Sequence, residues 1–198
     1  MHGAYREEPD RYEGRYKEKN IIHCVYAGTF DPRKGGAIAA VLMAEYLSEK
    51  YHVHILGFGN PTDTNKIKTI IEDVSQKSKA KVTFDGLLFG DEYINFIQRC
   101  DIGLSTQNPE EAFNATSFPS KILAYLANGL KVVSIRIPAV ETSAIGDYMY
   151  YYDIQTPEHI AKAIMGIDNK DEYDSRVIIR NLDKEFRKNL FLLLEQIN

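Results

Sequence analysis

The sequence contains no tryptophan, only two cysteines, and no apolar run long enough to cross a lipid bilayer. Its first twenty residues carry many charges and no apolar core, which excludes a secretory signal peptide. Two cysteines without such a signal indicate reduced thiols in the core, and Cys24 and Cys100 both lie in apolar segments. We therefore expect a cytoplasmic protein with no membrane span.

Several catalytic motifs are also missing. No G-x-G-x-x-G or G-x-x-x-x-G-K-[ST] occurs, which disfavours dinucleotide redox chemistry and P-loop hydrolysis. No G-x-S-x-G nucleophile elbow is present either. The five histidines show no ligand spacing along the chain, and we expect His52 and His54 at the surface rather than as ligands. The sequence therefore predicts no metal site.

The overall composition is that of an ordinary globular protein. Hydrophobic residues make up 44% of the 198 residues, and the net charge of −4 argues against a nucleic-acid partner. Residues 1–20 mix acidic, basic and tyrosine side chains, which is typical of a linker or an N-terminal extension. We expect the chain to begin at an interdomain connection.

A regular alternation of strand-like and helix-like segments begins after this extension. Strands are predicted at 21–27, 53–57, 81–84, 101–105, 131–135 and 148–152. The alternation predicts one α/β, Rossmann-like domain over 21–170: a mostly parallel six-stranded sheet with helices on both faces. A long helix in 171–198 is expected to pack on this domain or on a partner domain, and ligands should bind at the carboxyl ends of the strands.

The stretch from Glu110 to Ile135 is the most informative part of the chain. Pro119 suits a first helical position, and Gly129 is expected to end that helix in a left-handed conformation. Ser117, Ser120 and Lys121 at the helix start could hold an anion, since free N–H groups and the dipole favour negative charge there. The alternative is an ordinary α/β unit whose serines only cap the helix.

Two other turns have features that suit an anion. Lys34 lies in the glycine-rich turn GTFDPRKGG, before a helix expected to place Tyr46 and Leu47 on its apolar face. Gly57 and Gly59 would let the backbone approach a ligand closely. A polar helix is expected from about residue 65 to 77. Together with the helix start at Ser117–Lys121, these turns predict a diphosphate ligand.

Four phrases then carry a resemblance to a known family: VYAGTFDPRKGG (25–36), HILGFGN (54–60), VTFDGLLFGDEYINFIQRCDIGL (82–104) and FPSKILAYLANGLKVVS (118–134). In this order and spacing they resemble the C-terminal, donor-binding domain of retaining GT-B glycosyltransferases, from the bacterial group that builds capsule and lipopolysaccharide. The resemblance covers roughly residues 21–165. It implies one half of a GT-B fold.

The resemblance implies an NDP-sugar donor, first of all a UDP-sugar, and no other cofactor. Lys34 would contact the diphosphate as the catalytic residue, and the loop at Leu87 and Leu88 would recognise the base. The full nucleotide-binding set implied is Gly28, Thr29, Lys34, Gly57, Gly59, Leu87, Leu88, Ser117, Phe118, Ser120 and Lys121. The acceptor would bind a separate N-terminal domain, so we expect no transfer by this chain alone. The full enzyme would associate peripherally with a membrane.

This sequence departs from the family in two respects, and one is that Thr29 follows Gly28 where the family often has an arginine. Where the family often carries a pair of glutamates, it has Thr116 and Ala124, and the second glutamate is the one that typically holds the ribose. Three other functions stay open: a sugar-nucleotide epimerase half, a non-catalytic interaction module, and a flavodoxin-like or receiver domain. A receiver would need an acidic cluster after the first strand, and Gly28–Asp31 supplies one carboxylate.

Overall fold

The structure is a computed structural model that describes residues 6–10, 20–111, 117–167 and 174–195. Its strands are β1 (Ile22–Thr29), β2 (Tyr51–Phe58), β3 (Lys81–Gly86), β4 (Ile102–Ser105), β5 (Lys131–Ile135) and β6 (Tyr150–Tyr152). Its helices are α1 (Gly36–Leu42), α2 (Pro61–Ser75), α3 (Gly90–Gln98), α5 (Lys121–Ala127), α6 (Pro138–Glu141), α7 (Pro157–Met165) and α8 (Arg176–Glu195). Two short 3-10 helices, η1 (Met43–Tyr46) and η2 (Gly146–Tyr148), complete the described elements.

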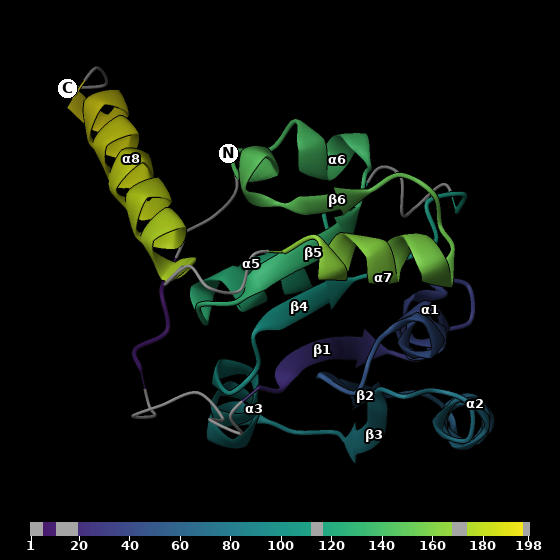
Figure 1. Cartoon of the computed structure of the whole chain (residues 1–198). Helices are drawn as coiled ribbons and strands as arrows, with labels where there is room; N and C mark the ends of the chain where they lie inside the picture. Colours follow the sequence, from purple (N-terminus) through teal and green to yellow (C-terminus); the bar gives the residue numbers. More distant parts are fainter. Residues whose placement is uncertain (1–5, 11–19, 112–116, 168–173, 196–198) are drawn as a thin grey trace.

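All six strands form one parallel sheet in the order β3-β2-β1-β4-β5-β6. Helices α1, α2 and α7 lie on one side of this sheet and α3 and α5 on the other (Figure 1). The α/β, Rossmann-like fold predicted from the sequence is therefore confirmed. The strand order reverses between β1 and β4, which is where sheets of this kind leave a crevice at their carboxyl edge.

The inner strands β1 and β2 are largely apolar because helices cover both faces of the sheet, although they also carry His23, His52 and His54. In β1, the residues from His23 to Ala27 are all buried, and β2 is buried from Val53 to Gly57. Both cysteines are free and buried, as predicted. Burial raises the pKa of both thiols, so they remain protonated and unreactive at neutral pH.

Tyr125 of α5 joins the two strands that flank the reversal. The pairing of β1 with β4 is short, and beyond it the Ala27 N–H donates to the Tyr125 hydroxyl oxygen at 2.8 Å. The ring is fully buried against Gly103, where an added Cβ would lie 2.3 Å from a ring carbon. One side chain thus satisfies a buried amide that the diverging strand β4 leaves unpaired.

Some element boundaries differ from the prediction. Helix α2 begins at Pro61 because Asn60 caps it, accepting from the Asp63 N–H at 2.8 Å, with proline at the first position. Helix α5 begins at Lys121 rather than at Pro119, whose carbonyl accepts from the Ile122 N–H at 3.0 Å. Gly129 does end α5 with a φ of 86°.

A further correction concerns the end of the first helix. The sequence predicted that Tyr46 would share the apolar face with Leu47, but Tyr46 is exposed and Leu47 is buried. The chain tightens into the 3-10 helix η1 at Met43, so the spacing of 3.6 residues per turn no longer holds.

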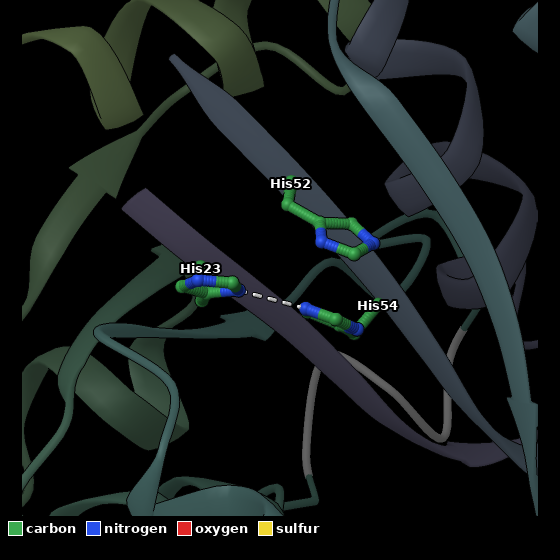
Figure 2. A group of neighbouring side chains, drawn as sticks. All are labelled: His23, His52 and His54. Atoms are coloured by element: carbon green, nitrogen blue, oxygen red, sulfur yellow. Dashed lines mark hydrogen bonds between the residues drawn. The ribbon is translucent and has the colours of Figure 1, made fainter. Parts of the chain in front are cut away.

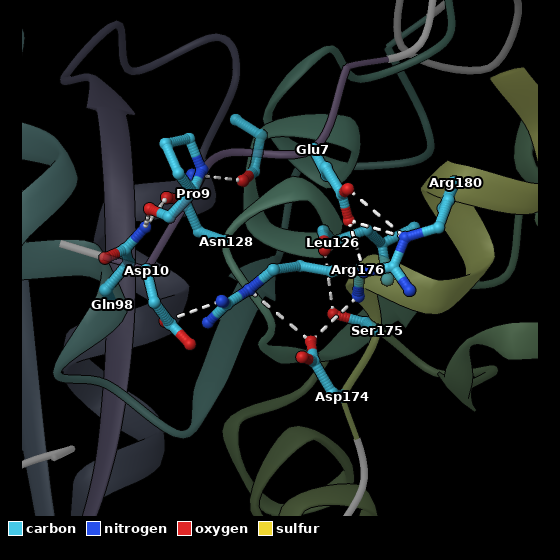
Figure 3. A network of polar contacts seen from close by, with 11 residues as sticks. Glu7, Pro9, Asp10, Gln98, Leu126, Asn128, Asp174, Ser175, Arg176 and Arg180 are labelled. Atoms are coloured by element: carbon cyan, nitrogen blue, oxygen red, sulfur yellow. Dashed lines mark hydrogen bonds and ion pairs between the residues drawn. The ribbon is translucent and has the colours of Figure 1, made fainter. Parts of the chain in front are cut away.

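Helix α8 packs on the domain only through its first turns. Ile178 and Ile179 are buried, and the Ser175 hydroxyl donates to the Leu126 carbonyl oxygen at 2.9 Å. Residues 6–10 lie against this start: Glu7 pairs with Arg180 (Figure 3). The Glu8 N–H donates to the Ala127 carbonyl oxygen. The rest of the helix projects away from the sheet (Figure 1). Within the described ranges, no helix combines the length and apolar character that a membrane crossing requires.

Candidate functional site

A cleft of about 300 Å³ opens at the carboxyl ends of β1 and β2, beside the reversal of strand order. Its walls come from the ends of both strands, the loop after β3, and the first turns of α3 and α5. The lining residues are Ala27, Gly28, Thr29, Leu56, Gly57, Phe58, Leu87, Leu88, Tyr93, Ser120, Lys121 and Ala124. This is the edge of the sheet where ligands of such folds bind.

Two glycines bring the backbone close to this cleft. Gly57 has a φ of 143°, and a Cβ there would lie 1.7 Å from the Gly28 carbonyl oxygen. A Cβ at Gly28 would lie 2.9 Å from the Lys121 Nζ atom. No side chain fits at Gly57, and one at Gly28 would displace the Lys121 ammonium group, so backbone atoms of β1 and β2 form the floor below Lys121.

Lys121 is the cation of this cleft. Its Nζ atom lies 3.9 Å from the ring centroid of Tyr26, whose hydroxyl donates to the Thr29 carbonyl oxygen at 3.1 Å. Burial, helped by the nearby charge of Lys34, lowers the pKa of Lys121 to about 7. No ion pair with a carboxylate involves Lys121 among the residues that the structure describes. An anion bound here would therefore meet an unneutralised lysine.

Lys34 lies in an adjoining, open hollow that shares Thr29 and Phe58 with the cleft. Its neighbour Asp31 forms an ion pair of 2.6 Å with Arg33, and this contact lowers the pKa of that carboxyl to about 2. Asp31 is thus already paired with Arg33. Lys34 itself has no ion pair among the described residues and is exposed.

The predicted site residues fall into three groups. Gly28, Thr29, Gly57, Leu87, Leu88, Ser120 and Lys121 line the cleft, and Lys34 and Gly59 line the adjoining hollow. Ser117 and Phe118 line neither: Ser117 is exposed, and Phe118 packs against the core. Ser120 makes no capping bond through its side chain. Thr116 lies outside the described residues, whereas Ala124 lines the cleft.

Three aromatic residues at the site were not predicted. Tyr26 lies under Lys121, and Phe58 and Tyr93 line the cleft. Phe58 follows directly on the predicted strand end at Gly57, so its position could have been inferred. In the sequence, Tyr26 has the pattern of a core residue of a strand and Tyr93 that of a core residue of a helix. The sequence carries no signal that separates them from their neighbours.

The histidine prediction is wrong in one respect. His23 and His54 are buried and His52 is half-buried, because alternate positions of β2 face α3, where Phe96 lies edge-on to His54 with ring centroids 5.1 Å apart. The three imidazoles lie together on this face (Figure 2). Burial and the neighbouring charges lower the pKa of His52 to about 3, so its ring is neutral.

Comparison with known proteins finds the same fold among solved structures. No family model matches the chain, and no curated protein matches it by sequence. Solved structures do match. The C-terminal domain of a glycosyl transferase group 1 family protein, LpcC, from Francisella tularensis aligns with a TM-score of 0.60 at 13% identity, over 90% of this chain and 95% of that one. This chain therefore has the fold of one half of a GT-B glycosyltransferase.

Two longer proteins contain a region with the same fold as this half-domain. A glycosyltransferase from Rickettsia africae aligns with a TM-score of 0.62 at 19% identity, over 91% of this chain and 49% of that one. Anabaena Alr3699/HepE, solved in complex with UDP and glucose, aligns with a TM-score of 0.61 at 12% identity, over 86% and 48%. The half-domain thus spans about half the length of these two chains.

Proposed function

We propose that this half-domain binds the nucleotide diphosphate of an NDP-sugar, first of all a UDP-sugar, as the donor-binding half of a glycosyltransferase. The observation that carries the proposal is the pair of lysines, Lys121 in the cleft and Lys34 beside it, neither of them neutralised by a carboxylate of the described residues. The fold agrees, since Anabaena HepE, with a similar half-domain, was solved with UDP.

The two lysines suit the chemistry of sugar transfer. When the bond between the sugar C1 and the diphosphate breaks, negative charge grows on the departing oxygens, and fixed cations there lower the barrier. Lys121 would lie at the inner end of the diphosphate and Lys34 at the outer end. In a retaining transfer, the acceptor oxygen bonds to C1 and the departing phosphate takes its proton, so no protein acid or base is required.

The rest of the cleft would hold the nucleoside. Leu87, Leu88 and Tyr93 form an apolar end that suits the face of a base, with backbone groups of the loop after β3 at its edge. Ala124 lines the same cleft and cannot accept hydrogen bonds from a ribose, as a glutamate would. We therefore expect nucleotide binding in the high micromolar to millimolar range.

A second domain would complete the enzyme. We propose that it carries the acceptor site, since chains with this half-domain are about twice as long. The acceptor would be a glycan or a lipid-linked glycan of cell-surface polysaccharide, with the complete enzyme in the cytoplasm and peripheral to a membrane. This part rests on the four sequence phrases that resemble the bacterial GT-B group. Transfer assays with lipid-linked acceptors on the full enzyme would test it.

Calorimetric titration of this chain tests the nucleotide site. UDP and UDP-glucose should bind, and Lys121→Met should weaken UDP by about 10- to 100-fold, the usual effect of losing a charge-assisted hydrogen bond. Lys34→Ala should weaken it by about 10-fold. The control Lys188→Ala, on the exposed part of α8, should change nothing. Silence across UDP, GDP, ADP and pyrophosphate at millimolar concentration, or equal affinity of all variants, would refute the proposal.

A further inference from the structure

A second polar site lies near the amino ends of β1 and β2. His23 and His52 are paired neighbours in the register of these strands, and His54 lies two residues further along the same face of β2. Each histidine offers a ring nitrogen, and the three nitrogens lie within 4.8 Å of one another. His23 Nδ1 and His54 Nε2 are already 3.0 Å apart (Figure 2).

His54 has the outer carboxylate partner that is typical of a metal-ligating histidine. Asp85 Oδ2 lies 3.2 Å from His54 Nδ1, and the Thr83 hydroxyl donates to the same carboxylate oxygen at 2.9 Å. A carboxylate on the far ring nitrogen orients a histidine and raises its basicity as a ligand. This arrangement leaves Nε2 of His54 directed toward His23.

From this geometry we propose that His23, His52 and His54 form a binding site for a zinc-class divalent cation, with Asp85 as a positioning residue. Imidazole nitrogens are the ligands such ions prefer. A tetrahedral Zn²⁺ with bonds of about 2.0–2.1 Å holds its ligand nitrogens roughly 3.3 Å apart, so small ring rotations suffice. The ion would take the place of the proton between His23 and His54.

The surroundings leave room for a fourth ligand. A hollow of about 250 Å³ borders the three rings, lined also by Asp85, Lys81 and Arg99, and a water molecule there can complete the coordination. Lys81 is exposed, so its ammonium group can turn toward solvent while its stem stays at the hollow.

The site is separate from the nucleotide cleft. His23 lies five residues before Gly28 on β1, which is about 16 Å along a strand. A metal here would cross-link β1 and β2 under α3 and would not touch a donor nucleotide. Its failure would therefore leave the glycosyltransferase proposal unaffected.

The experiment uses tag-free chain stripped with a chelator and titrated with ZnCl₂ or CoCl₂. We expect one ion per chain and, with Co²⁺, the visible absorption of a tetrahedral site. Asp85→Asn should weaken binding by about 10- to 100-fold, the usual effect of losing the outer partner of a ligand. His52→Gln and His54→Gln should weaken it at least as much.

The controls separate this site from weak surface binding. His159→Gln removes a histidine of α7 outside the cluster, and Lys81→Gln removes a cation but no ligand, so neither should weaken binding. X-ray absorption of the zinc-loaded wild type counts the imidazoles and needs no variant to fold. Three imidazoles support the proposal. Absence of the Co²⁺ bands, fewer than three imidazoles, or binding that survives both His52→Gln and His54→Gln would overturn it.

Discussion

Lys121 departs furthest from ordinary behaviour among the residues at the cleft. Its pKa of about 7, well below the 10.5 of a free lysine, follows from burial over Tyr26 and from the charge of Lys34. Between these two pH values the unfolded chain binds more protons than the folded one, so this residue adds stability as the pH rises. Below pH 7 the folded domain carries this charge in a partly buried place, with no carboxylate of the described residues paired to it.

A bound diphosphate should reverse this effect. Its negative charge raises the pKa of Lys121, so binding above pH 7 requires uptake of a proton. We expect UDP affinity to fall as the pH rises from 7 to 9, by up to about tenfold per pH unit for one proton. Calorimetry in buffers of different ionisation enthalpy would measure the uptake. Lys121→Met should abolish it, and an unchanged pH profile in that variant would contradict the assignment.

Among the elements, the ends of β1 and β2 depend most on a single backbone position. Gly57 combines a φ of 143° with contact to the Gly28 carbonyl oxygen, so the two strands approach more closely than any side chain allows. Gly86, at the end of β3, has a φ of 78° but open space where a Cβ would lie. Comparing Gly57 with Gly86 therefore separates the cost of a left-handed backbone conformation from the cost of a steric clash between strands.

Substituting alanine at each position should reveal this difference. Gly86→Ala should lower the free energy of unfolding by about 1–2 kcal/mol, the usual cost of a left-handed alanine. Gly57→Ala should cost about 3 kcal/mol or more, since the strands must also separate. Urea denaturation of both variants gives the comparison. Equal losses would mean that the β1–β2 contact yields without cost.

At this scale the sequence predicted the elements better than their contacts. The strands were predicted because most of them are apolar or β-branched runs bounded by turn residues, whereas the start of α2 was missed because the cap at Asn60 was overlooked. The pairing of His23 with His52 depends on strand register. Register is settled by packing across the sheet, and spacing along the chain does not carry it.

The same limit applies to the candidate site: its turns and helix starts can be predicted locally, but the contacts between them cannot. Gly28, Gly57 and Lys121 were predicted because turns and helix starts are visible in the sequence, and the structure brings them together at one cleft. Ser117 and Phe118 were placed there through a predicted helix start at Pro119, but α5 begins at Lys121. That shift leaves the two residues outside the cleft.

For the whole molecule, α8 is the element that the domain packs incompletely. Its start is held by buried isoleucines and by residues 6–10, including the ion pair of Glu7 with Arg180 (Figure 3). Further along, Phe191 is 62% exposed, and its leucine neighbours are also in contact with solvent. Exposed apolar patches of this kind are a common feature of protein–protein contact surfaces.

Polar substitution of the projecting part should therefore leave the fold intact. Phe191→Ser with Leu193→Ser should change the free energy of unfolding by at most about 0.5 kcal/mol, as for other exposed positions. Ile179→Ala, at the buried start, should cost about 2–5 kcal/mol. Chemical denaturation measures both, and sedimentation should show less self-association of the serine variant. A large loss of stability in that variant would mean that this part packs on the domain.

The loop that carries Leu87 and Leu88 contacts the core through Leu88 and exposes Leu87. Gly86 and Gly90, which bracket it, have open space around them, and Leu87 is 43% exposed. If the cleft binds a nucleotide as proposed, libraries confined to this loop would change which nucleoside is accepted and leave the two lysines unchanged. Selectivity for the nucleoside would then be altered separately from binding of the diphosphate.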